Sequence, residues 1–308
     1  MDKPSGPLTL GVVGSGQMGG GIAMAGLITG HDVYAFDQNE EAVQRLMTRA
    51  DSADASQLPS ERDPGLPPVE RPGRLHPVSS LEGLASCDVI IEAVQEDMAT
   101  KKSIFSALDE CCPQDTIFAS NTSALSITEM GAATQRPDRV GGLHFHIPVT
   151  VMHVVEVING EQTSQQTVDT LSKVARNLGK QVVLAKDTPG FIVNRLLVPY
   201  ILDAIRVVEQ GTADRDAVDI SMRMACRHPM GPLQLGDFIG LDTLRSMSLT
   251  LFNGLGEERF RPPELLEELV SSGYFGAKNG RGFYNYKDPQ NEGDRNANIT
   301  ARFAELLQ

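Results

Sequence analysis

Six histidines are the side chains in this sequence best suited to exchange a proton near neutral pH, and His144 is the best placed of them. It lies near the end of an expected strand, Arg139 to Phe145, and a second expected strand, Val154 to Ile158, follows after a short loop. If the two strands form an antiparallel pair centred near Thr150, residues equidistant from Thr150 face each other, which places Glu156 opposite His144. A carboxylate in that position orients the imidazole and favours its charged form, so the pair predicts a general base.

The same histidine allows two other interpretations. By itself, a histidine at the end of a strand is more often a structural residue. Alternatively, His144 and His146 alternate onto one strand face, and His153 and Glu156 are near them in the sequence, which would suit a metal ion. We expect no bound metal, and a measurement of zinc or iron in the purified protein decides between the base and the metal site.

A glycine-rich turn follows the first expected strand, Leu8 to Val13, and precedes the first expected helix, Gln17 to Thr29. It matches G-x-G-x-x-G, in which the glycines allow a tight turn, close approach of a pyrophosphate and close packing of helix on strand. The phosphates would lie at the positive N-terminus of the helix. An ordinary glycine turn is the alternative. The motif predicts a dinucleotide site formed by Gly14, Gly16, Gln17, Met18 and Gly19.

The second expected strand, Asp32 to Phe36, is followed at once by Asp37. A carboxylate here would accept hydrogen bonds from a ribose diol and repel a 2′-phosphate. This favours NAD as the cofactor, although Arg45 on the next helix leaves NADP open. A nicotinamide cofactor implies hydride transfer, and hydride transfer needs a group such as His144 to exchange the substrate's proton.

The pattern of elements indicates two domains. Up to about residue 187, short apolar runs alternate with helical patterns, which is typical of a parallel sheet with crossover helices. Long helical patterns then begin with FIVNRLLVPYILDAIRVVEQG. We therefore expect an α/β Rossmann-type NAD-binding domain with a mostly parallel sheet over residues 1–187 and an all-α domain over 188–308. The remaining expected strands are Asp88 to Val94, Thr116 to Ala119 and Gln181 to Ala185, and the remaining expected helices are Glu40 to Arg49, Thr100 to Glu110 and Ser164 to Leu178.

Composition excludes several classes of protein. The 308 residues include 40 acidic residues and 27 lysines and arginines, a net charge of −13. Nucleic-acid binding takes most of its affinity from basic side chains, so we expect no nucleic-acid partner. No apolar stretch approaches the roughly 20 residues that a bilayer requires, so we expect no membrane span. The N-terminal residues do not resemble a signal or transit peptide, and the four cysteines have no metal or disulfide spacing, so we expect a cytoplasmic protein with reduced thiols.

The sequence as a whole resembles the 3-hydroxyacyl-CoA dehydrogenases, including the 3-hydroxybutyryl-CoA dehydrogenases of bacteria. The resemblance extends over nearly the whole chain. It depends on these motifs: GVVGSGQMGGGIA, EAVQED, FASNTS, LHF followed by PVTVMHVVEVI, KDTPGFIVNRLLVPY, HPMGPLQLGDFIGLDT and KNGRGFYNY. The last four together are far more specific than the glycine motif.

The resemblance implies roles for individual residues. His144 would be the catalytic base and Glu156 its partner, while Ser123 and Asn194 would orient the substrate oxygen and the cofactor. Without the family, Ser123 and Asn194 would be indistinguishable from turn and capping residues. Other residues that match family contacts to NAD are Glu96, Lys101, Ser123 and Lys278. The family also implies a homodimer in which the helical domains pair, and the apolar run from residue 191 to residue 208 is compatible with this.

Two departures from the family pattern lie beside His144. The family usually has H-F-F-N-P where this chain has His144-Phe145-His146-Ile147-Pro148, so the asparagine that helps to hold the cofactor is replaced by Ile147. One hydrogen bond is therefore lost or supplied by His146. The usual P-V-P-V-M-K reads PVTVMH here, which changes the loop that follows. Substrate range or direction would be affected first.

The third departure is the segment from Thr48 to Ser80, where the family carries a lysine-rich helical hairpin that binds the phosphates of coenzyme A. This chain has no lysine between Lys3 and Lys101, and the segment contains six prolines and mixed charges. We expect a poorly ordered, exposed connection there, with a short helix at its start. The acyl group would be carried either by CoA or by the phosphopantetheine arm of an acyl carrier protein.

Two further alternatives concern activity. A nucleotide-binding protein without turnover would not need to keep Ser123, His144, Glu156 and Asn194 together. The related 3-hydroxyisobutyrate and 6-phosphogluconate dehydrogenases use a catalytic lysine after a glycine-rich turn, and residues 190–199 contain none. The sequence therefore favours an NAD-dependent oxidoreductase that acts on a 3-hydroxyacyl thioester.

Overall fold

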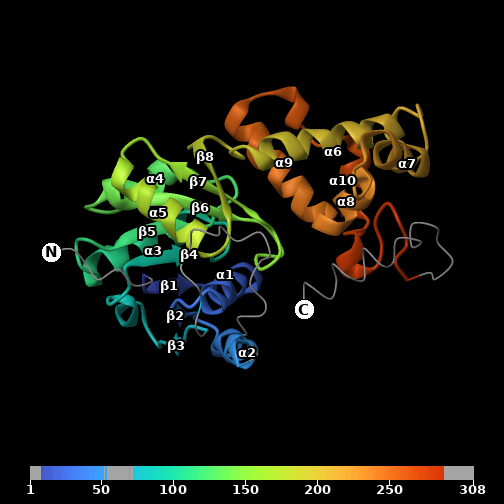
Figure 1. Cartoon of the computed structure of the whole chain (residues 1–308). Helices are drawn as coiled ribbons and strands as arrows, with labels where there is room; N and C mark the ends of the chain where they lie inside the picture. Colours follow the sequence, from blue (N-terminus) through green and yellow to red (C-terminus); the bar gives the residue numbers. More distant parts are fainter. Residues whose placement is uncertain (1–7, 52, 54–68, 70–71, 288–308) are drawn as a thin grey trace. The chain divides into compact units, whose positions relative to one another are not determined.

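The computed structural model describes residues 8–51, 53, 69 and 72–287 (Figure 1). These residues divide after Thr188 into two compact units, which we call the N-terminal unit and the C-terminal unit. The N-terminal unit contains one sheet with helices on both faces, and the C-terminal unit is helical. Both observations confirm the predicted fold class.

The eight strands form one sheet in the order β3-β2-β1-β4-β5-β6-β7-β8. Strands β1 to β6 are parallel, β7 is antiparallel to β6, and β8 is parallel to β7. The strands are short, and β1, β4, β5 and β6 are buried throughout, as expected for strands covered on both faces. The bounds are β1 (Leu10–Val13), β2 (Val33–Phe36), β3 (Leu75–Pro77), β4 (Val89–Glu92), β5 (Ile117–Ser120), β6 (Val140–Phe145), β7 (Val154–Asn159) and β8 (Gln181–Lys186).

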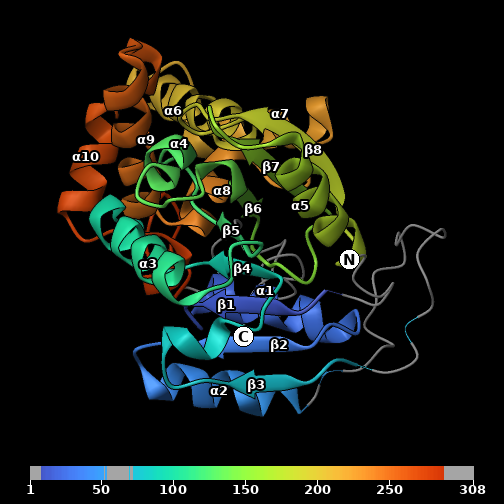
Figure 2. The same cartoon turned by 90° about the vertical axis from the view of Figure 1, so that its left-hand side faces the viewer.

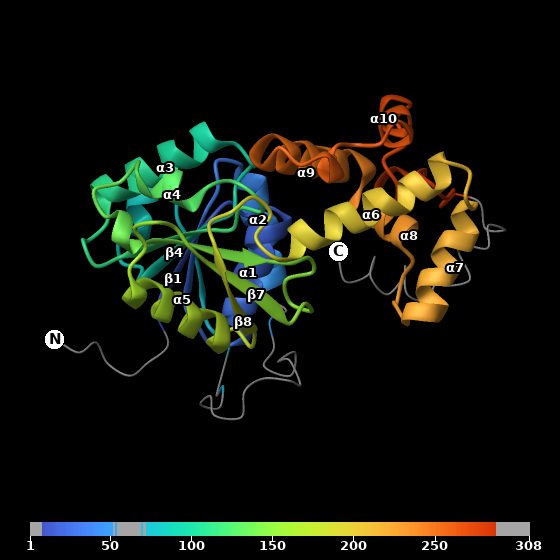
Figure 3. The ribbon, with the colours of Figure 1, turned by 90° about the horizontal axis from the view of Figure 1, so that it is seen from above.

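Helices cover the two faces of this sheet (Figure 3). On one face α1 (Gln17–Ile28) and α5 (Gln165–Asn177) share a buried apolar cluster with the strands, and α2 (Glu40–Ala50) adds Leu46 to it. On the other face α3 (Met98–Cys111) and α4 (Ile127–Gly131) pack together, and Phe105 of α3 contacts Phe118 of β5. This packing on both faces holds the strands of the sheet, so their carboxyl ends lie side by side.

The strand order reverses at β1, because the chain builds β2 and β3 on one side of it and β4 to β6 on the other. Ligands of open α/β sheets bind beside the carboxyl ends of the strands at such a reversal. The glycine-rich turn follows β1, and the turn containing Ser123 follows β5. His144 is the penultimate residue of β6. The predicted site residues of the N-terminal unit therefore gather at one edge of the sheet.

Strand β3 corrects our expectation for the segment from Thr48 to Ser80. Helix α2 extends to Ala50, and Leu75 to Pro77 pair in parallel with β2 at the edge of the sheet (Figure 2). A three-residue strand that ends in proline gives no period-2 signal, and proline is tolerated on an edge strand. The rest of the expected loop, residues 52, 54–68 and 70–71, lies outside the described residues.

The helices of the C-terminal unit enclose their own apolar core, to which Ile201, Leu244 and Phe260 contribute. After the last helix, residues 276 to 285 form isolated β-bridges instead of continuing the helical pattern. The bounds are α6 (Val193–Glu209), α7 (Arg215–Cys226), α8 (Pro232–Ile239), α9 (Leu241–Leu255) and α10 (Glu264–Ser271). None of the helices in the described part of the chain is long and apolar enough to cross a membrane. All four cysteines are free thiols.

Two buried carboxylates organise the C-terminal unit. Asp219 of α7 accepts hydrogen bonds from the backbone N–H groups of Leu233 and Gln234 at the start of α8, at 2.8 and 2.9 Å, and from the Tyr284 hydroxyl at 2.9 Å. Asp237 of α8 accepts from the backbone N–H groups of Phe283 and Tyr284, both at 2.9 Å. Burial raises the pKa of Asp237 to about 6. The two carboxylates thus connect α7, α8 and the segment that contains Phe283 and Tyr284.

We expect Asp219→Ala to lower the free energy of unfolding by about 3 kcal/mol, because it leaves two buried N–H groups and one buried hydroxyl without an acceptor. Chemical denaturation followed by circular dichroism measures the change. Asp216→Ala is the matched control, since that side chain lies on the same helix, is 59% exposed and contacts only the neighbouring Arg215 in the described ion pairs. Equal stability of the two variants would contradict the structural role of Asp219.

Candidate active site

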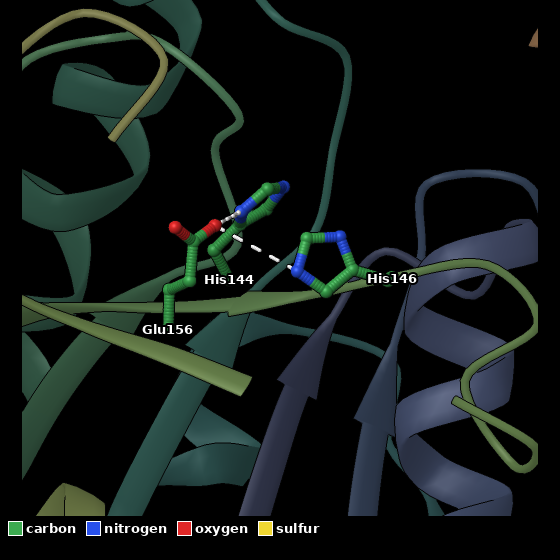
Figure 4. A group of neighbouring side chains, drawn as sticks. All are labelled: His144, His146 and Glu156. Carbon is green, nitrogen blue, oxygen red and sulfur yellow. Dashed lines mark hydrogen bonds and ion pairs between the residues drawn. The ribbon is translucent and has the colours of Figure 1, made fainter. Parts of the chain in front are cut away.

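The antiparallel pair of β6 and β7 has the predicted register, in which His144 faces Glu156. The Nδ1 atom of His144 lies 2.7 Å from Oε2 of Glu156, and both side chains are almost completely buried (Figure 4). An ionised carboxylate can only accept a hydrogen bond. In the neutral ring, Nδ1 therefore carries the proton and donates this hydrogen bond to Glu156. The other ring nitrogen, Nε2, is then left with a lone pair that can accept a proton.

Ser123 identifies the direction in which Nε2 of His144 points. The serine hydroxyl lies 3.2 Å from Nε2, which is hydrogen-bond distance. The turn that carries Ser123 is tied to the sheet, because Oδ1 of Asn121 accepts the backbone N–H of Phe145 at 2.9 Å. The histidine and the serine are therefore held in a fixed relation by neighbouring strands.

Glu96 holds the same turn from the side of β4. Its Oε1 atom accepts the backbone N–H of Ser123 at 2.9 Å and the hydroxyl of Thr122. Its Oε2 atom lies 3.3 Å from Nζ of Lys101. Glu96 therefore connects α3 to the turn next to His144, and its predicted contact with the cofactor stays a prediction.

Lys101 is buried, with a side chain only 1% exposed, and its ammonium group has three acceptors. These are Glu92 Oε1 at 2.7 Å, Glu96 Oε2 at 3.3 Å and the backbone oxygen of Val94 at 3.3 Å. Glu92 also accepts the Ser120 hydroxyl at 2.7 Å. Sequence reasoning missed Glu92, although an acid at the end of the apolar run VIIE is a signal that a buried cation lies nearby.

His146 lies against the pair formed by His144 and Glu156. Its ring meets that of His144 edge to face with centroids 4.6 Å apart, and its Nε2 atom lies 3.7 Å from Oε2 of Glu156. Burial, more than the neighbouring His144, lowers the pKa of His146 to about 4, although Glu156 acts in the opposite direction. His146 is thus neutral near pH 7. In the described part of the chain, His144, His146 and Glu156 form a group whose geometry could hold a metal ion, and His153 is outside this group.

Lys180 supports the loop that follows His146. Its buried ammonium group donates to the backbone oxygens of Val149 at 2.6 Å and Met152 at 2.8 Å. Burial lowers the pKa of Lys180 to about 8. Sequence reasoning also missed this residue, because a lysine between a helix and a strand carries no signal of burial. Ile147, which stands where the family has asparagine, is 41% exposed in this loop.

The glycine-rich turn has the form that a dinucleotide needs. Gly14 has a φ of +95°, and a Cβ atom on Gly19 would lie 1.8 Å from the backbone oxygen of Gly14, so neither position accepts a side chain. Gly16 and Gln17 are exposed, and a Cβ atom on Gly16 would meet nothing within 4 Å, which leaves open space beside the backbone. Gly16 precedes α1, and no side chain caps that end of the helix. A pyrophosphate fits such a turn.

Asp37 and Ser15 add two observations about the same turn. Asp37, just beyond β2, accepts the backbone N–H groups of Ser15 at 2.6 Å and Asn39 at 2.8 Å, so its carboxylate stands beside the turn. The Ser15 hydroxyl is buried and has no hydrogen-bond partner among the described residues. A hydroxyl without a partner and an oriented carboxylate suit a ligand rich in hydroxyl and phosphate oxygens. The residues present therefore fit NAD.

The remaining predicted residues belong to the C-terminal unit. Asn194 is buried in the first turn of α6. Lys278 is exposed, and its ammonium group pairs with the carboxylate of Asp242 at 2.5 Å. The structure describes each unit by itself, so the roles of Asn194 and Lys278 toward substrate and cofactor stay predictions.

Family comparison assigns both units. Residues 9–188 match the NAD-binding domain of 3-hydroxyacyl-CoA dehydrogenase, and residues 190–286 match the C-terminal domain of the same family. Among curated proteins, the chain is 43% identical over 277 residues to the probable 3-hydroxybutyryl-CoA dehydrogenase of Bacillus subtilis, covering 90% of this chain and 96% of that protein. It is 40% identical to the human mitochondrial hydroxyacyl-coenzyme A dehydrogenase, with 90% of each chain covered.

Solved structures agree with this assignment. The crystal structure of (S)-3-hydroxybutyryl-CoA dehydrogenase from Ralstonia eutropha is 37% identical and superposes with a TM-score of 0.83, covering 92% of this chain and all of that one. The 3-hydroxybutyryl-CoA dehydrogenase from Escherichia coli is 38% identical with a TM-score of 0.84, covering 92% of this chain and 61% of that one. The chain therefore belongs to the 3-hydroxyacyl-CoA dehydrogenase family and is an NAD-dependent dehydrogenase.

Proposed function

We propose that this enzyme interconverts 3-hydroxyacyl and 3-oxoacyl thioesters, with coenzyme A as the carrier of the acyl group. The observation that carries the proposal is the buried pair of His144 and Glu156, whose reactive nitrogen Nε2 points toward Ser123. The names of the Bacillus subtilis and Ralstonia eutropha relatives support a short 3-hydroxyacyl-CoA as substrate.

The chemistry needs one proton acceptor and one hydride acceptor. In the oxidation direction, Nε2 of His144 takes the proton of the 3-hydroxyl, and the carboxylate of Glu156 stabilises the imidazolium that forms. When bound, NAD would supply the hydride acceptor for C3 in this direction, and its reduced form the hydride donor in the other. In reduction, the imidazolium gives its proton to the oxygen of the 3-oxo group. The charges balance in both directions because proton and hydride leave the same alcohol.

Polar groups around His144 would orient the reacting oxygen. Ser123 already hydrogen-bonds Nε2, so a substrate hydroxyl could bind both groups without displacing the turn. The amide side chain of Asn194 would be a further orienting group. The glycine-rich turn, Asp37, Glu96, Lys101 and Lys278 would hold NAD. We infer a preference for NAD over NADP because the Asp37 carboxylate repels a 2′-phosphate.

The second candidate function is the same reaction on an acyl group bound to an acyl carrier protein. One observation favours it: the chain has no lysine between Lys3 and Lys101, where the family places a basic surface for the phosphates of coenzyme A. The reacting carbon is remote from the carrier, so the residues around His144 would serve either substrate.

A panel of acetoacetyl thioesters with NADH tests both functions. We expect NADH to be consumed with acetoacetyl-CoA, and more slowly when NADPH replaces NADH. The same acetoacetyl group on a phosphopantetheinylated acyl carrier protein is the matched substrate. Turnover of the carrier-protein thioester alone would favour the second function. NAD binding without turnover of any thioester would reject both.

We expect His144→Ala to lower kcat by about 10²–10⁴-fold, which is the usual contribution of a positioned acid or base. Glu156→Gln should also lower kcat, because a neutral amide next to Nδ1 removes the charge that stabilises the imidazolium on which the reaction depends in both directions. His76→Ala is the control, since His76 stacks on Tyr34 in the opposite part of the sheet, on the edge strand β3. Steady-state rates with NADH that are equal in all three variants would contradict the assigned base.

We infer from the family that the enzyme is a homodimer paired through its C-terminal unit. In support, α7 exposes Ile220 and Met224 one turn apart, with exposed fractions of 53% and 73%. We expect sedimentation equilibrium to give about twice the chain mass of 33.3 kDa, and Ile220→Asp with Met224→Asp to give the monomer. Leu184→Asp on β8 is an equally exposed control and should stay dimeric. A monomeric wild type would reject the dimer.

A further inference from the structure

The side chains of His144, His146 and Glu156 point toward one another, and His146 has no role in the proposed reaction. One nitrogen from each histidine and one oxygen of Glu156 all lie within 4.8 Å of one another (Figure 4). Of these three side chains, the reaction proposed above uses only those of His144 and Glu156. His146 contributes a third potential ligand atom, and its Nε2 atom is buried without a hydrogen-bond partner among the described residues.

We propose that these three side chains form a binding site for one zinc ion, and that zinc bound there inhibits the enzyme reversibly. Two imidazoles and one carboxylate are a usual ligand set for zinc, with a fourth position left for water. The excess of acidic residues in the chain, which gives a net charge of −13, also raises the local concentration of cations.

The distances are compatible with tetrahedral zinc. Ligand atoms on such an ion, with bonds of about 2.0–2.1 Å, are separated by about 3.4 Å. In this structure, Oε2 of Glu156 lies 2.7 Å from Nδ1 of His144 and 3.7 Å from Nε2 of His146. The ligand nitrogens of the two histidines lie within 4.8 Å of each other, so rotations of the side chains would bring all three ligand atoms to an ion. An ion would enter beside His146, whose side chain is 16% exposed, whereas the other two are 4% and 0% exposed.

Inhibition follows from the chemistry of the imidazole ring, and this step rests on the proposed role of His144. Zinc must take the lone pair of Nδ1, so the proton on Nδ1 leaves and Nε2 gains one, which leaves the net number of protons unchanged. The ring then presents an N–H toward Ser123 instead of a lone pair. It can no longer accept the proton of a substrate hydroxyl.

Zinc binding is measured by equilibrium dialysis against zinc chloride, independently of activity. Inhibition is measured in the oxidation direction, with 3-hydroxybutyryl-CoA and NAD, with and without EDTA. All proteins carry Cys226→Ser, because Cys226 is an exposed thiol that could bind zinc elsewhere. We expect one zinc ion per chain, and reversible inhibition by zinc but not by magnesium, which prefers six oxygen ligands. His146→Phe keeps a ring of similar shape and should raise the half-inhibitory zinc concentration by about tenfold or more.

Each variant is compared with its own metal-free rate. The proposal is supported if His146→Phe and His144→Ala both lose the bound zinc ion. It is overturned if His146→Phe retains that ion, if wild type binds none, or if zinc inhibits wild type and His146→Phe equally. A failure of the proposed function would appear separately, as a wild-type enzyme without turnover in the absence of zinc, and would leave the dialysis result intact.

Discussion

The proposed reaction centre depends on one constraint, the antiparallel register between β6 and β7. Side chains alternate between the faces of a strand, so a shift of one residue would move Glu156 to the opposite face of the sheet from His144. The register is held on both sides, because β5 pairs with β6 and β8 pairs with β7 along its whole length. Apolar neighbours such as Leu143 and Val157 face the cluster under α1 and α5, which leaves His144 and Glu156 on the other face. The alternation of apolar and polar residues in the hairpin thus keeps His144 opposite Glu156, the alignment that the proposed base requires.

A second set of buried charges extends this alignment to the neighbouring strands. Glu92 at the end of β4 holds the ammonium group of Lys101, and Lys101 in turn faces Glu96, which binds the turn of Ser123. A buried ion pair is a weak source of stability by itself, because both charges lose their hydration. Here the pair has further hydrogen bonds from Ser120 and to Val94, and removal of either partner would leave a charge buried alone. The pair fixes where the ends of β4, β5 and α3 lie relative to one another. Through Glu96, it also fixes the position of Ser123.

Local patterns predicted most of this arrangement, and the failures have physical causes. The parallel strands and the helices between them follow from apolar periodicity, and the pairing of His144 with Glu156 follows from a hairpin centred near Thr150. Strand β3 was missed because three edge residues that end in proline carry no period. Glu92 was missed although an acid that ends the apolar run VIIE signals a buried cation nearby. Lys180 was missed because its partners are backbone oxygens, which no side-chain pattern records. Charged residues that the family assigns to the cofactor, such as Lys101, are held first by the protein itself.

The acidic character of the chain separates two problems of phosphate recognition. The pyrophosphate of NAD can be met by backbone N–H groups at the start of α1, where Gly16 leaves open space, so this contact needs no basic side chain. Coenzyme A carries its phosphates at the far end of a long arm, away from the thioester, and its recognition requires cations or another partner surface. With no lysine from residue 4 to residue 100, the chain keeps the first solution and lacks the usual form of the second. In the function that we propose, the reacting carbon and the carrier are recognised by different parts of the molecule, so the carrier could change while His144, Glu156 and the hydride chemistry stay the same.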